Sequence, residues 1–173
     1  MKRAAVLMAL FRIFMFPINT RPMNRKIEKL RIILVDDMPD EHVIFRQVLH
    51  SLEFLDLELF SCDSAAELEN FLAAPAQTPP HIVFLDMHMP EKNGVECLRD
   101  LRGNLKYKET VVAMYSVSAD EDTIGNCLAA GANIFITKPR DLKVLKNTLN
   151  EVVRSCIQYH SMALNFETFV RTF

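Results

Sequence analysis

From residue 31 onward, short runs of apolar and β-branched residues alternate with longer segments in which apolar residues recur at helical spacing. This alternation is typical of repeated strand–helix units around a parallel sheet, and five such units are present. We predict strands at Arg31–Val35, Leu57–Ser61, Ile82–Leu85, Val111–Tyr115 and Asn133–Ile136, with helices near 39–52, 64–73, 92–103, 119–130 and 141–158.

The first and third predicted strands contain the continuous apolar runs IILV and IVFL. Strands that are covered by helices on both faces have this pattern, so these two are expected at the centre of the sheet. The segment AAPAQTPP holds three prolines in eight residues and is expected to form the loop before the third strand. By their helix or strand spacing we expect ordinary core positions at Met114, Leu128, Val144, Leu145 and Leu149.

The two ends of the chain differ from this pattern. Residues 4–16 follow a basic start and resemble the apolar run of a signal peptide, but Arg12 interrupts the run and no A-x-A site follows. The run is shorter than the roughly 20 residues that span a bilayer, so no stable membrane span is expected. Residues 1–30 are interpreted as an N-terminal extension. One alternative is an amphipathic surface helix. We favour a poorly ordered segment together with a start codon assigned too early, so that the protein begins at Met23. Residues 158–173 form a C-terminal tail that either packs back on the domain or docks a partner.

Composition narrows the class of protein. A chain of 173 residues, half of them hydrophobic and 24% charged, is enough for about one globular domain at residues 31–157. Residues 1–30 carry seven Lys and Arg against one Glu, which leaves 13 basic and 21 acidic residues in the rest. An acidic body argues against direct nucleic-acid binding. The four cysteines show no metal or disulfide spacing, so we expect reduced thiols and a cytoplasmic protein.

Polar residues follow four of the predicted strands. Asp36-Asp37 follow the first strand, Asp86 the third, Ser116 the fourth and Lys138 the fifth. Each alone has an ordinary explanation, such as a helix cap or a turn, but in a parallel sheet all of these positions converge on one edge. Neighbouring carboxylates repel unless a cation joins them, and Mg²⁺ prefers carboxylate and phosphate oxygens. The convergence therefore predicts a phosphoryl-binding site.

The motifs around these residues resemble those of a known family. They are IILVDD at 32–37, IVFLDMHMPEKNG at 82–94, MYSVSA at 114–119 and AAGANIFITKP at 129–139. With 30 residues from Asp86 to Ser116 and 22 from Ser116 to Lys138, the chain resembles the receiver domain of response regulators, the CheY-like module of two-component signalling. The resemblance implies a flavodoxin-like (βα)5 fold of the α/β class, a doubly wound parallel five-stranded sheet with strand order 2-1-3-4-5.

The resemblance also implies roles for the residues at the strand ends. Asp86 would be the phosphoacceptor, and Lys138 and Ser116 would contact the phosphoryl oxygens. The expected magnesium ligands are Asp36, Asp37, Asp86 and the backbone carbonyl of His88. Phosphorylation would draw the Ser116 hydroxyl inward and let Phe135 fill the vacated space, which would change the face of the fourth helix, fifth strand and fifth helix.

The expected function is a stand-alone signalling switch. A sensor histidine kinase or phosphotransfer protein would supply the phosphoryl group, and an unknown protein target would receive the signal, with dimerisation through the switch face left open. The protein would be no enzyme beyond its own phosphoryl transfer and dephosphorylation. An aspartyl phosphohydrolase of the haloacid-dehalogenase type needs a second Asp where this chain has His88. An unphosphorylated pseudo-receiver stays open because Val117 follows Ser116 where Ala or Gly is commoner.

Overall fold

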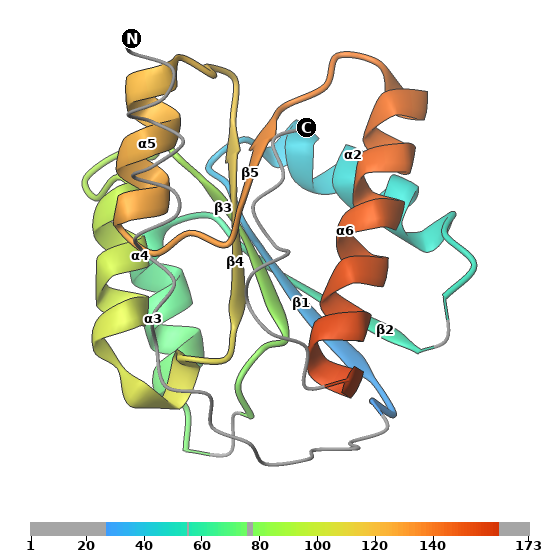
Figure 1. Ribbon diagram of the computed structural model, residues 1–173, viewed down its shortest axis with the longest axis horizontal. Coiled ribbons are helices and arrows are strands. Elements are labelled where there is room, and N and C mark those ends of the chain that lie inside the picture. Colours follow the sequence, from blue (N-terminus) through green and yellow to red (C-terminus); the bar gives the residue numbers. More distant parts are fainter. Residues whose placement is uncertain (1–26, 55, 76–77, 163–173) are drawn as a thin grey trace, which may run out of the picture.

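The structure is a computed structural model that describes residues 27–54, 56–75 and 78–162. The predicted N-terminal extension, apart from residues 27–30, and the last eleven residues of the predicted tail lie outside this described part. What the structure describes is a sheet between two layers of helices (Figure 1).

The five strands form one parallel sheet. They are β1 (Leu30–Val35), β2 (Leu57–Cys62), β3 (Ile82–Asp86), β4 (Val111–Ser116) and β5 (Ile134–Thr137). Their order is β2-β1-β3-β4-β5, and each neighbouring pair is parallel. Each strand lies within one residue of its predicted bounds, so the expected flavodoxin-like architecture is confirmed.

A helix follows each strand, and together the helices cover both faces of the sheet (Figure 1). Helices α2 and α6 lie on one face, and α3, α4 and α5 lie on the other. Their bounds are Pro39–His50 for α2, Ala65–Ala73 for α3, Gly94–Gly103 for α4, Glu121–Ala129 for α5 and Leu142–Met162 for α6, with a 3₁₀ turn at Leu105–Tyr107. Side-chain caps start three of them: Ser64, Asn93 and Asp120 each accept a backbone N–H of the first helical turn.

The central strands are buried on both faces, as their apolar runs predict. Ile32 and Leu34 of β1 pack in the cluster that contains α2 and α6, whereas Ile33 and Val35 pack in the cluster that contains α3, α4 and α5. Successive side chains of a strand point to opposite faces, which requires an apolar residue at every position of a doubly covered strand. The resulting rigid core fixes the positions of the strand ends.

Helix α6 extends four residues beyond its predicted end at residue 158. Cys156 and Tyr159 continue the buried stripe of this helix past Val152, so the helical turn there is stabilised by packing on the sheet. Among the described helices, α6 included, none is both long and apolar enough to cross a lipid bilayer.

One predicted core position is wrong. Met114, Leu145 and Leu149 are buried, and Leu128 is half-buried, but Val144 is 51% exposed. The buried face of α6 includes residues 145, 149, 152 and 156, at spacings of three and four, and Val144 lies one position away from it. Its side chain therefore faces solvent.

Candidate functional site

The polar residues named from the sequence meet at the carboxyl edge of the sheet. Asp36 directly follows β1, Asp86 is the last residue of β3, and Ser116 is the last residue of β4. Lys138 directly follows β5. Strand β1 lies between β2 and β3, and its following helix covers the opposite face from the helices that follow β2 and β3. In doubly wound sheets, ligands bind at the carboxyl ends of strands where the connections diverge in this way.

The Lys138 ammonium joins the carboxylates of two strands. Its Nζ atom lies 2.6 Å from Asp36 Oδ2 and 2.8 Å from Asp86 Oδ1. The Lys138 side chain is only 9% exposed, and Asp36 is fully buried. Charge-assisted hydrogen bonds of this length in a site shielded from water are strong, so the three side chains hold one another in place.

The remaining oxygens of these two carboxylates accept backbone N–H groups. The His88 N–H donates to Asp86 Oδ2 at 2.7 Å, and the Met38 N–H donates to Asp36 Oδ1 at 3.0 Å. The side chain of His88 is exposed, so the contact that this residue makes with Asp86 is through its backbone. Each carboxylate is therefore oriented by one backbone donor and one ammonium.

The pKa values of Asp36 and Lys138 are both raised, but for different reasons. Burial raises the pKa of Asp36, and this effect outweighs the opposing bond from Lys138. Burial alone would lower the pKa of Lys138, but its hydrogen bonds to Asp36 and Asp86 hold that pKa above its usual value. The Lys138 ammonium has a hydrogen-bond acceptor in each of the two carboxylates. Each carboxylate, however, is only partly neutralised, because the two share one positive charge.

Asp37 extends the negative charge of the site. It is half-buried, and its carboxylate makes no hydrogen bond or ion pair with any other described residue. As the side chains are placed, no three His, Cys, Asp or Glu residues of the described part gather closely enough to enclose a metal ion. The three carboxylates nevertheless outnumber the one ammonium, and their oxygens are ligands of the kind that hard divalent cations prefer.

Ser116 ends β4 at the same edge of the sheet and makes no hydrogen bond with Asp36 or Asp86. Its hydroxyl is fully buried, and its Oγ accepts the Ser118 N–H at 3.2 Å. Val117, between these two residues, is 72% exposed and stands at the solvent side of the site. Phe135 is 1% exposed and packs within the core on the face of α3, α4 and α5.

Two residues that the sequence reasoning did not single out also belong to the site. The Lys138 ammonium lies over the ring of Tyr115, 5.1 Å from its centroid. The Tyr115 hydroxyl lies 3.5 Å from Glu41 Oε2 on α2, a long hydrogen bond. Tyr115 directly precedes Ser116, and a polar aromatic residue at the end of a buried strand was the signal that could have identified it.

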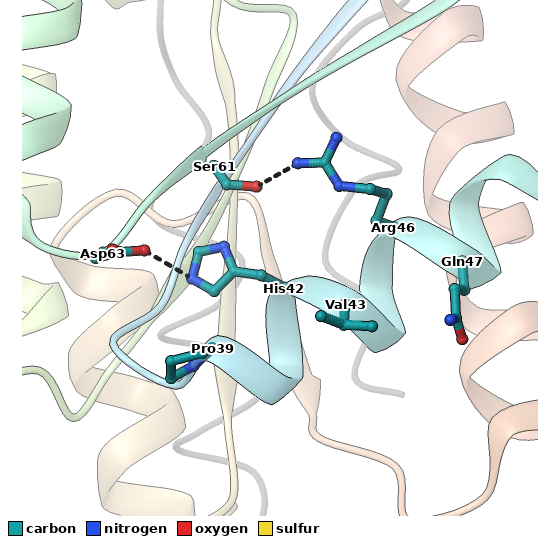
Figure 2. A pocket seen from close by; sticks show the side chains of 7 residues that line it. All are labelled: Pro39, His42, Val43, Arg46, Gln47, Ser61 and Asp63. Carbon is teal, nitrogen blue, oxygen red and sulfur yellow. Dashed lines mark hydrogen bonds and ion pairs between the residues drawn. The ribbon is translucent and has the colours of Figure 1, made fainter.

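A shallow pocket lies next to this site, between α2 and the end of β2 (Figure 2). It measures about 440 Å³, and its lining includes His42, Arg46, Ser61 and Asp63. His42 Nε2 donates to the backbone carbonyl of Asp36 at 2.5 Å and lies 3.5 Å from Asp63 Oδ1. His42 therefore fixes the main chain that carries Asp36, while the pocket itself contains none of the converging carboxylates.

Comparisons with known proteins agree with this arrangement. The sequence model of the response regulator receiver domain matches residues 32–150, most of the chain. The chain therefore belongs to the response regulator receiver domain family of two-component signalling, and the predicted resemblance is confirmed. Chemotaxis protein CheY1 of Helicobacter pylori is 27% identical over 124 residues, which cover 72% of this chain and 97% of that protein. The transcriptional regulatory protein DegU of Brevibacillus brevis is 26% identical over 140 residues, which cover 80% of this chain and 57% of DegU.

Solved structures show the same fold. The Mn²⁺-bound form of response regulator Rcp1 superposes with a TM-score of 0.63 at 25% identity, over 71% of this chain and 91% of that one. The phosphorylated cyanobacterial phytochrome response regulator RcpA superposes with a TM-score of 0.69 at 22% identity, over 78% of this chain and 98% of that one.

Proposed function

We propose that this chain is a phosphorylation-dependent switch of a two-component or phosphorelay system, with Asp86 as its phosphoacceptor. The observation that carries the proposal is the position of the Lys138 ammonium between the Asp36 and Asp86 carboxylates. Ser116 ends the neighbouring strand β4 at the same edge of the sheet. A phosphoryl group on Asp86 would meet a fixed positive charge on one side and a hydroxyl donor on the neighbouring strand.

The residues present can perform the transfer. An oxygen of the Asp86 carboxylate attacks phosphorus in line, and the new O–P bond forms as the bond from phosphorus to the donor breaks with its electron pair. The donor is a phosphohistidine of a sensor kinase or phosphotransfer protein, or a small acyl phosphate. Lys138 lies 2.8 Å from Asp86 Oδ1 and can follow the charge onto the phosphoryl oxygens. The protein thus catalyses only its own phosphorylation and dephosphorylation.

The donor set also fits a divalent cation, which we propose to be Mg²⁺. Asp36, Asp37, Asp86 and the backbone carbonyl of His88 would hold it, because three carboxylates exceed the charge of Lys138. Asp37, half-buried and unpaired among the described residues, can turn toward such an ion. When bound, the ion supplies further positive charge for the phosphoryl oxygens. The matched Rcp1 structure is a Mn²⁺-bound form.

The proposed switch couples this site to the surface of α5, β5 and α6. The Ser116 Oγ now accepts a backbone N–H, so its own proton is free to be donated to a phosphoryl oxygen. Phe135 already lies in the core, so its response would be a shift within the core rather than an inward turn from solvent. Leu142 and Val144 are exposed apolar residues at the start of α6, and they offer a protein target or a second copy a contact surface.

Intact-mass measurement tests the proposal. We expect acetyl phosphate with Mg²⁺ to add one phosphoryl group to the natural protein and none to Asp86→Asn. Asp63→Asn is the matched control, because it removes the same charge from an 81% exposed side chain at the end of β2 and should accept the group normally. EDTA should prevent the adduct. Absence of an adduct, repeated with a phosphorylated histidine kinase as donor, would favour a pseudo-receiver that only binds partners, and Val117→Ala would then test whether the exposed branched side chain blocks access.

A further inference from the structure

Tyr115 is placed beneath Lys138 by the register of two neighbouring strands. Tyr115 of β4 pairs with Ile136 of β5, and both belong to the core cluster on the face of α2 and α6. Lys138 follows Ile136 by two residues, so its side chain starts on this same face. The stem of the lysine therefore passes over the tyrosine ring on its way to the carboxylates, and the ammonium lies 5.1 Å from the ring centroid.

The Lys138 ammonium contacts the ring of Tyr115 in addition to the two carboxylates. Asp36 and Asp86 accept two of its hydrogen bonds, and the face of an aromatic ring attracts a cation through its quadrupole. This attraction is stronger where water is excluded, and both the Lys138 side chain at 9% and Tyr115 at 1% exposure meet that condition. The ring thus adds a third contact without adding a charge.

The ring is itself held firmly. It packs edge-on against Phe45 of α2 with centroids 6.1 Å apart, and its hydroxyl points to Glu41 of the same helix. Burial raises the pKa of Tyr115, so the phenol stays neutral and does not compete with the carboxylates for the ammonium. A lysine has a flexible four-carbon stem, and a rigid wall beside it restricts where its ammonium can lie.

We propose that Tyr115 is a positioning residue for Lys138. Its ring packs against the lysine side chain and keeps the ammonium within reach of Asp86 before and during phosphoryl transfer. This inference rests on the proposed function of Asp86 and Lys138. The ring face makes the contribution, and the hydroxyl bond to Glu41 only orients the ring. Loss of the hydroxyl should therefore matter little, whereas loss of the ring should free Lys138 from its position and slow phosphorylation.

Two variants of Tyr115 and one control separate these effects. Tyr115→Phe keeps the ring, and Tyr115→Leu removes it. Tyr107→Leu is the control because Tyr107 is also buried and also has a lysine ammonium, that of Lys106, over its ring, but it precedes β4 and so lies at the opposite edge of the sheet. We expect the initial phosphorylation rate with acetyl phosphate and saturating Mg²⁺ to fall about five- to thirty-fold in Tyr115→Leu. It should fall less than about threefold in Tyr115→Phe and in Tyr107→Leu, and saturating Mg²⁺ keeps any change in ion affinity from affecting the comparison.

Nuclear magnetic resonance of the natural protein gives a second readout that does not depend on phosphorylation. The ring current of Tyr115 should move the ε-methylene protons of Lys138 upfield of those of exposed lysines, and Tyr115→Phe should preserve this shift. Lys138 protons at the ordinary lysine position, or an unchanged rate in folded Tyr115→Leu, would overturn the role of Tyr115 while leaving Asp86 as the phosphoacceptor. If the natural protein accepts no phosphoryl group, the proposed function fails, and the upfield shift alone then decides whether the ring positions Lys138.

Discussion

At the scale of single residues, the site carries more negative charge than its one lysine neutralises. Asp36 and Asp86 share the Lys138 ammonium, and Asp37 adds a third carboxylate beside Asp36. Burial raises the pKa of Asp36 even with Lys138 in contact, which means that the folded protein disfavours the ionised carboxylate. A bound cation would stabilise this ionised form.

Magnesium should therefore stabilise the folded protein. At an ion concentration ten times its dissociation constant, the free energy of unfolding should rise by about 1.4 kcal/mol. Asp37→Asn should raise the stability of the ion-free protein because it removes one repelling charge, and it should lose most of the response to magnesium. Urea denaturation at pH 7 with and without Mg²⁺ measures both effects. Asp40→Asn removes a charge from an exposed position nearby and should respond as the natural protein does; a full response in Asp37→Asn would exclude that carboxylate as a ligand.

The convergence of Asp36, Asp86 and Lys138 could be predicted from the sequence because each follows or ends a strand and parallel strands end on one edge. The role of Tyr115 could not be predicted in this way. It depends on the pairing of Tyr115 with Ile136, and the apolar pattern of β4 and β5 fits more than one such register.

At the scale of elements, two helical glycines differ in the space around them. A Cβ on Gly94, at the start of α4, would lie 2.2 Å from the backbone oxygen of Asp86. Gly125 lies within α5, and a Cβ there would meet nothing within 4 Å. The loop after Asp86 thus passes too close to α4 for any side chain, while α5 has room for one.

The same substitution should therefore change stability in opposite directions. Gly125→Ala should raise the free energy of unfolding by about 0.5–1 kcal/mol, because alanine favours the helix interior. Gly94→Ala should lower it by about 2 kcal/mol or more, because backbone atoms must move, and it should also slow phosphorylation of Asp86. Thermal denaturation of the pair is a direct comparison, and equal midpoints would contradict the close approach seen at Gly94.

Arg102 links α4 to the segments around β4 and β5. Its guanidinium donates to the backbone carbonyls of Gly131 and Thr110 and to the side-chain oxygen of Asn133, which also accepts the Val112 N–H. No pattern in the sequence marks this arginine, because its partners are mostly backbone carbonyls brought together only by the fold. It anchors the turn that leads into β5, the strand that ends before Lys138.

Removal of this anchor should weaken the fold. Arg102→Met keeps the apolar stem but leaves half-buried carbonyls without donors, so the free energy of unfolding should fall by about 2–3 kcal/mol. Arg99→Met, at an exposed position of the same helix, should change it by less than about 0.5 kcal/mol. Urea denaturation of both variants measures the difference. A loss in Arg102→Met as small as that in Arg99→Met would show that the carbonyls are satisfied by water instead.

At the scale of the whole molecule, the two edges of the sheet differ in the residues that gather there. The carboxyl edge collects the charged residues, whereas at the opposite edge the end of α6 closes on the loop before β3. There the His81 Nδ1 accepts the Arg31 N–H at 3.0 Å, and His160 Nε2 donates to the His81 carbonyl at 3.1 Å. The last turn of α6 is stabilised by the continued apolar stripe and also by these contacts with a distant segment, which helical periodicity alone does not reveal.

The bond from Arg31 requires a neutral His81, because a protonated Nδ1 cannot accept an N–H. Burial, together with nearby His160 and Arg31, lowers the pKa of His81 to about 4 from 6.5, and burial also lowers the pKa of His160. A lowered pKa in the folded state means that the unfolded chain binds the extra proton first. The stabilisation is therefore complete above about pH 6.5 and is lost as the pH falls toward 4. Protonation of His81 Nδ1 would also break its bond from Arg31.

His81→Gln should remove the contribution of His81 to this pH dependence, because a glutamine oxygen can accept the Arg31 N–H without titrating. A shift of this size corresponds to about 3 kcal/mol in a fully desolvated site, and the half-buried position of His81 reduces it to about 1–2 kcal/mol. Between pH 7 and pH 4 the natural protein should lose that much more stability than His81→Gln, as measured by urea denaturation at each pH. His50→Gln, exposed on α2, should follow the natural protein. Parallel curves for the natural protein and His81→Gln would mean that the closure tolerates a charged histidine, and the acid sensitivity of the fold would then arise from its carboxylates.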